Sequence, residues 1–188
     1  FNPTPTELIS LTAFYKLIKN PISRIEVASA GGYLSYENIA DKATVAGVEV
    51  EVRKNLFVRP LSSAANGMNK LSFGLNGSYI YTNAKMPLAT VTTGSQLEGA
   101  APWIANFDLS HNFTKGNHSF INTLVFNYVS DKIYTIGTQG YQDIIEQGMM
   151  TLDFVSQAKL NKYVSLTLKA RNLLNPSYKL SRKANESG

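Results

Sequence analysis

LSFGLNGSYIY, residues 71–81, alternates between two kinds of side chain. The odd positions carry Leu, Phe, Leu, Gly, Tyr and Tyr, while the even positions include Ser, Gly, Asn and Ser. A repeat of two residues is the pattern of a β-strand with one apolar face. Asn76-Gly77 taken alone favours a hairpin turn, but the alternation runs through this dipeptide without a break. We therefore predict one strand that continues across it.

The same alternation recurs along the chain. It is clear in residues 9–17, 44–53, 103–113, 150–160 and 164–170. It is less regular in residues 118–129, because Asn122 interrupts the apolar face. The sequence predicts an all-β protein with about seven long strands and no helix.

The connections between these strands alternate in length from the third strand onward. Residues 83–102 and 130–148 are long connections, whereas residues 114–117 and 161–162 are short ones. In an antiparallel up-and-down sheet this alternation places every long loop at one end and every short turn at the other. Transmembrane β-barrels are built in this way.

Aromatic residues gather toward the ends of the apolar faces. With the long-loop end called the top, Tyr and Trp lie near the top and Phe near the bottom, namely Tyr15, Tyr79, Tyr81, Trp103 and Tyr128 above and Phe113 and Phe120 below. Amphipathic rings prefer the headgroup level of a bilayer, while aliphatic side chains suit its hydrocarbon interior. This distribution favours a strand surface that faces lipid.

Composition excludes several classes of function. The 188 residues contain no Cys and two His, so disulfides and thiolate metal sites are ruled out and a zinc centre has little material. Charged residues make up only 16% of the chain, and its net charge of +5 comes from dispersed Lys and Arg. No basic stripe indicates nucleic-acid binding. We predict no cofactor, no metal and no enzymatic activity.

Alternation alone leaves two architectures open. A soluble β-domain would turn its apolar face inward around a ligand or partner, and a membrane barrel would turn it toward lipid. The predicted strands are as long as a tilted membrane crossing requires, which favours the barrel. Because open sheet edges are costly in lipid, and because the sequence starts at Phe1 rather than Met and ends in no recognisable element, we expect a piece of a longer chain whose other strands close the barrel.

Five stretches also resemble the C-terminal barrel region of TonB-dependent outer-membrane receptors. They are ISLTAFYKLIKNPI (9–22), KATVAGVEVEV (42–52), LEGAAPWIANFDL (97–109), FNYVSDKIYTIG (126–137) and LTLKARNLLNPSY (166–178). The resemblance implies a fragment of an antiparallel, up-and-down transmembrane barrel of 22 strands, spanning residues 1–188. It also implies a bacterial outer-membrane location and import of a siderophore, cobalamin, haem or glycan with energy from TonB.

The expected partners are outer-membrane lipid, an upstream plug domain, TonB and a small-molecule or glycan substrate. Neither the plug nor the final strands of the family occur in this sequence, so the chain is not expected to transport by itself. Outer loops contact substrate in this family, which makes five residues candidate contacts: Trp103, Tyr134, Tyr141, Asp143 and Glu146. The two carboxylates lack a partnered nucleophile, which argues against catalysis.

Overall fold

The chain forms β-strands throughout the regular part of its computed structural model, which describes residues 1, 6–27, 31–38, 40–61, 67–85 and 96–182. The long strands are β1 (Leu8–Lys19), β4 (Lys42–Leu61), β5 (Gly67–Lys85), β6 (Trp103–Lys115), β7 (His118–Val129), β10 (Met149–Lys159) and β11 (Ser165–Ala170). The short strands are β2 (Ile22–Glu26), β3 (Leu34–Asn38), β8 (Lys132–Thr135), β9 (Ile144–Glu146) and β12 (Leu180–Arg182).

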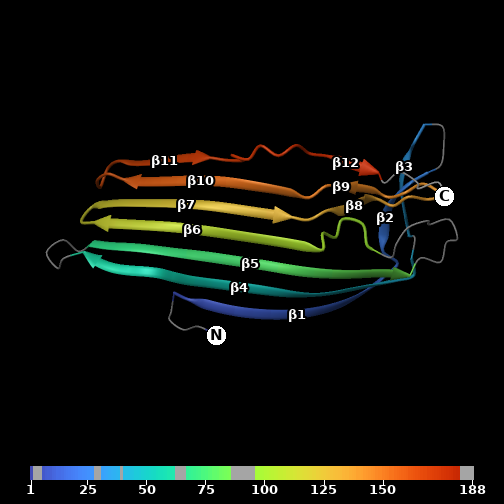
Figure 1. Ribbon diagram of the computed structural model, residues 1–188, viewed down its shortest axis with the longest axis horizontal. Helices are drawn as coiled ribbons and strands as arrows, with labels where there is room; N and C mark the ends of the chain where they lie inside the picture. The colour runs from blue at the N-terminus through green and yellow to red at the C-terminus, as the bar shows by residue number, and fades with distance from the viewer. Residues whose placement is uncertain (2–5, 28–30, 39, 62–66, 86–95, 183–188) are drawn as a thin grey trace.

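The long strands make one 7-stranded antiparallel sheet in the order β1-β4-β5-β6-β7-β10-β11. Each long strand therefore pairs with its nearest long neighbour in the sequence. The turns between β6 and β7 and between β10 and β11 lie at the left end in Figure 1, and the short strands lie at the right end. The all-β antiparallel prediction is confirmed. The sheet does not close on itself within the described residues, where β1 and β11 form its two edges.

Strand β5 is continuous across Asn76-Gly77, as the unbroken alternation predicts. Strand β4 continues beyond the predicted residues 44–53, and a β-bulge between Asn55 and Phe57 interrupts its sequence pattern. A bulge adds one residue to one strand, so the outward positions change from even numbers to odd ones at this point. The alternation in the sequence therefore stops there, although the strand continues to Leu61.

The apolar face of the sheet is uncovered. We call it the outward face, and it includes Leu11 (75% exposed), Trp103 (56%) and Leu168 (63%). Among the described residues, the fully buried apolar side chains are few and lie outside its middle: Ile25, Ala40, Ala43, Ala84, Ala101, Ile133 and Ile136. The soluble alternative requires an internal apolar core, and the long sheet has none in the described part of the chain. An apolar surface of this extent marks contact with a membrane or another protein.

The outward apolar stripe crosses the strands at a slant. One row of paired residues runs through Ile9, Val52, Leu75, Phe107, Phe126 and Leu152. The middle of the β1 stripe, Ala13, lies on the loop side of this row, and Leu168 of β11, opposite Ser156, lies on its turn side. The shift is roughly 27 Å along the strands over roughly 29 Å across the sheet. For these apolar residues to lie at one level in a membrane, the strands would have to tilt by roughly 40 to 45° from the membrane normal, as they do in membrane barrels.

Polar residues on the outward face bond to one another. Asn122, which interrupts the predicted stripe, accepts a hydrogen bond from Ser156 Oγ at 2.7 Å. His111 Nε2 lies 2.8 Å from Asn69 Oδ1. Hydrogen bonds between neighbouring strands thus give partners to polar side chains that would otherwise lack them on an apolar surface. Phe113 and Phe120 pack nearby, with ring centroids 6.5 Å apart, beside the turn at Gly116.

Candidate functional site

The described parts of the long connections form a cap at one end of the sheet, which we call the loop layer. It consists of β2 and β3, residues 96–102, β8, β9 and β12. Strands β12, β9 and β8 form a 3-stranded sheet, and β2 and β3 form a 2-stranded one. Figure 1 shows both at the right end of the long sheet. The sequence predicts these segments only as loops, because strands of three to five residues are too short for a pattern.

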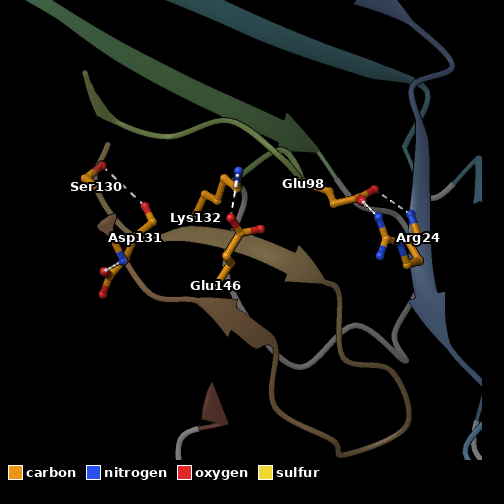
Figure 2. A network of polar contacts seen from close by, with 7 residues as sticks. Arg24, Glu98, Ser130, Asp131, Lys132 and Glu146 are labelled. Atoms are coloured by element: carbon orange, nitrogen blue, oxygen red, sulfur yellow. Dashed lines mark hydrogen bonds and ion pairs between the residues drawn. The ribbon is translucent and has the colours of Figure 1, made fainter. Parts of the chain in front are cut away.

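Arg24 and Glu98 join two parts of the loop layer. The guanidinium Nη2 lies 3.3 Å from Glu98 Oε1, and the Arg24 backbone N–H donates to Glu98 Oε2 at 2.6 Å. The guanidinium also stacks over the Tyr134 ring, 4.2 Å from its centroid. Figure 2 shows this pair connecting β2 to the segment that precedes β6. One carboxylate therefore holds both the backbone and the side chain of Arg24.

The main chain reinforces this junction. Ile25 and Ile136 form a parallel bridge, in which the Glu26 N–H donates to the Ile136 carbonyl at 3.2 Å and the Ile136 N–H donates to the Arg24 carbonyl at 3.0 Å. Ile25, Ile133 and Ile136 make a small buried core with Ile145 against it. The loop layer is therefore held by its own packing, which gives any side chain on it a fixed place.

A hollow of about 170 Å³ opens where β7 and β10 enter the loop layer, and its exposed lining is mostly apolar with a smaller polar part. Lys132 and Glu146 stand at its edge as an ion pair, with Nζ 3.0 Å from Oε1. Asn127 Nδ2 donates to Thr151 Oγ1 at 3.0 Å within its lining. Asn127 and Thr151 face away from the outward surface, so the hollow lies on the polar face. The polar part of its lining carries one cation and one anion, Lys132 and Glu146, which are paired with each other.

Aspartates shape the backbone around this hollow. Asp131 Oδ1 accepts a hydrogen bond from the Gly148 N–H at 2.5 Å, which joins the two ends of the connection between β7 and β10. Figure 2 shows Ser130 and Asp131 beside the Lys132–Glu146 pair. Asp143 Oδ1 accepts from the Gly137 N–H at 2.8 Å. These carboxylates support loops and do not point to acid/base chemistry.

The structure brings together four of the five predicted contact residues and separates the fifth. Tyr134 and Glu146 lie in the loop layer beside Arg24 and Lys132. Tyr141 and Asp143 lie in the same connection, and Arg182 sits over the Tyr141 ring at 5.5 Å. Trp103 lies instead on the outward face, packed on Tyr79 with ring centroids 4.5 Å apart.

Two groups in the loop layer have shifted pKa values. Desolvation lowers the pKa of Arg24, but the negative charges that Tyr36, Tyr134 and Glu98 can carry raise it more, so the net shift is upward. Arg24 thus stays a cation. The pKa of the Tyr178 phenol is raised by desolvation and then by the carboxylate of Glu146. Tyr178 therefore keeps its proton at neutral pH.

The sequence analysis missed Arg24, Glu98 and Lys132. Arg24 and Glu98 are separated by 74 residues, so no local spacing connects them. Along the strands, the polar face holds further charged groups, such as Glu51 paired with Arg53 at 2.7 Å and Asp108 packed on Gly74. These residues place charges on the polar face in the middle of the sheet.

In the part of the chain that the structure describes, no three His, Cys, Asp or Glu side chains converge as metal ligands would. The same residues contain no helix able to span a membrane.

Comparison with known protein families shows a match over most of the chain. The family model described as TonB dependent receptor-like, beta-barrel matches residues 1–173. No curated protein matches the chain, and no solved structure does either. The matched range covers the whole sheet from β1 to β11.

Proposed function

Because the chain belongs to the TonB-dependent receptor-like β-barrel family, we propose that it forms part of the wall and outer loops of a receptor that imports a nutrient across the bacterial outer membrane. The family consists of outer-membrane transport receptors. The finer parts of the proposal are the energy source, TonB, and the cargo, which is a siderophore, cobalamin, haem or glycan. A match to the barrel alone does not distinguish among these cargo classes.

The observation that carries this proposal is the slanted, exposed apolar belt on one face of the sheet, opposite a hydrophilic face. Leu11, Val50 and Leu168 are exposed on the belt, whereas Glu51 and Arg53 form an ion pair on the other face. Each large apolar side chain transferred from water to hydrocarbon contributes about 1.5 to 3 kcal/mol. A barrel wall with lipid outside and a hydrated lumen inside accounts for both faces.

The edges of the sheet support the proposal that further strands complete the barrel. Strands β1 and β11 each have one neighbour among the described residues. Unpaired backbone groups cost several kcal/mol each in lipid, so pairing partners for both edges are needed in the membrane. In the proposed receptor a plug domain encoded upstream fills the lumen and passes the force from TonB. The charged lumen face is suited to a removable plug.

We propose that substrate contacts the loop layer at this hollow. Glu146 is the predicted contact residue that lines it, and Lys132 lines it beside Glu146. Tyr134 lies outside the lining, on the same strand as Lys132. Tyr141 and Asp143 lie in the same connection, where the Asp143 carboxylate accepts a hydrogen bond from the Gly137 N–H. Trp103, on the outward face beside Tyr79, is better placed to mark the membrane boundary than to reach a ligand in the lumen.

The test uses the whole receptor gene in a bacterial strain that lacks it. Growth is measured on a panel of ferric siderophores, cobalamin, haem and glycans, each as the limiting source, with and without TonB. We expect growth on one compound to require both the receptor and TonB. A double variant, Lys132→Ala with Glu146→Ala, is expected to raise the concentration for half-maximal uptake about tenfold, as loss of charged hydrogen bonds implies.

The control for this variant is Glu37→Ala, which removes an exposed charge on β3. It is expected to leave uptake unchanged. If no compound on the panel shows growth that depends on both receptor and TonB, the import proposal fails. If uptake occurs and the double variant matches the control, only the assignment of the hollow fails.

A further inference from the structure

The outward face contains a hollow of about 360 Å³ that the barrel role does not explain. Gly77 of β5 and Ala105 of β6, which pair with each other, form its floor. A Cβ atom built at Gly77 would have no heavy atom within 4 Å. The hollow therefore exists because two adjacent outward positions carry almost no side chain. Its volume lies in the lower part of the range of small-molecule sites, roughly 300 to 1,000 Å³.

Larger side chains on four strands wall this hollow. Val50 and Tyr128 stand at the two ends of the row that contains Gly77 and Ala105. Tyr79 and Trp103 form the wall on the loop side, where their rings pack against each other at 4.5 Å. The result is a groove that runs across β5 and β6, bounded by aromatic rings.

The residues that line this groove determine which kind of ligand it can hold. All the exposed lining is apolar, so a polar ligand would lose its hydration without gaining hydrogen bonds. The groove is also continuous with the surface that faces hydrocarbon, and its rings lie at the loop end of the apolar belt. Tyr and Trp carry a polar tip on an apolar body and prefer the headgroup level, so a molecule in the groove would have its apolar part among their rings and its polar part beyond them.

We propose that this groove seats one acyl chain of a membrane lipid from the leaflet on the loop side. The lipid chain fills the space above Gly77 and Ala105, and the Tyr79–Trp103 wall separates it from the headgroup. This inference rests on the membrane placement in the proposed function, but it is independent of the imported nutrient. A groove that orders one chain differs from the rest of the belt, where lipid exchanges without a defined position.

The test compares lipid retention by the whole receptor, purified in detergent, using native mass spectrometry. The probes are two phosphatidylethanolamines with the same headgroup, one with palmitoyl and one with hexanoyl chains. We expect the wild-type receptor to retain the long-chain lipid at collision energies that remove the short-chain lipid. Gly77→Leu, which fills the groove, is expected to retain about one long-chain lipid fewer.

Ala158→Leu is the matched control, because Ala158 lies on the outward stripe of β10 toward the turn end. It is expected to behave as wild type, and Ala105→Leu, which fills the groove from the next strand, is expected to behave as Gly77→Leu. Equal retention of both lipids by wild-type receptor, or equal retention by the groove and control variants, overturns the proposal. Uptake measured in the same strains separates this failure from failure of the import function. The comparison of chain lengths needs no variant and stands even if a substitution prevents folding.

Discussion

At the scale of single residues, Glu98 joins two parts of the loop layer. Its carboxylate holds both the backbone and the guanidinium of Arg24, and each side chain of the pair is less than a quarter exposed. Glu98→Ala should leave a partly buried cation without its partner, at a cost of about 1 to 3 kcal/mol. We expect amide hydrogen exchange in residues 130–138 to become about tenfold faster, whereas Glu37→Ala leaves it unchanged. Unchanged exchange in Glu98→Ala would show that the Ile core alone holds the layer.

A second residue-scale effect concerns the polar pair on the outward face. Asn122→Ala removes the acceptor of the Ser156 hydroxyl and should destabilise the barrel by about 0.6 to 2 kcal/mol, the range for hydrogen bonds in membranes. The double variant Asn122→Leu with Ser156→Ala removes both polar groups and should restore stability. The measurement is the temperature at which the receptor loses its folded mobility in electrophoresis. A double variant as unstable as the single one would contradict this account.

At the scale of strands, the contact between β1 and β4 depends on a glycine. A Cβ at Gly47 would lie 2.5 Å from the Phe14 ring and 2.6 Å from the Tyr79 carbonyl oxygen. Because the second atom belongs to the backbone, rotation of Phe14 does not relieve the overlap. Gly47→Ala should cost about 1 to 3 kcal/mol, as overpacking does, and lower the denaturant midpoint of folding. Gly77→Ala, which enters open space, is the control, and equal midpoints would refute the prediction.

The strand scale also shows which structure the sequence can predict. Each long strand carries its own alternation, so all seven were predictable from local pattern alone. The bulge between Asn55 and Phe57 reverses that alternation, which is why the end of β4 was missed. Strands β2, β8 and β9 are too short for a pattern, and their order depends on distant contacts such as Ile25 with Ile136. Four of the predicted contact residues, all except Trp103 of β6, could be placed in the connection between β7 and β10, but not relative to Arg24 or Lys132, for the same reason.

At the scale of the whole molecule, the slant of the apolar belt determines depth in the membrane. Residues of one paired row lie at different heights if the strands are tilted. Phe107 lies near the middle of the belt on β6. Leu152, in the same row, lies nearer its loop edge on β10, and Ile9 lies nearer its turn edge on β1. If depth in the membrane follows the paired row, these three positions lie at the same depth. If it follows the slanted belt, they lie at different depths.

Arginine substitutions along this row distinguish the two. A cation facing lipid costs about 2 to 4 kcal/mol at the bilayer midplane and about 0 to 1 near the interfaces. Phe107→Arg should therefore reduce folding into phosphatidylcholine vesicles most, and Leu152→Arg and Ile9→Arg should reduce it less. Asn106→Arg, one residue away on the lumen face, is the control and should be tolerated. Equal costs at all three outward positions would mean that depth in the membrane follows the paired row. A cost at Asn106 as large as at Phe107 would mean that the two faces of the sheet do not contact lipid and water respectively.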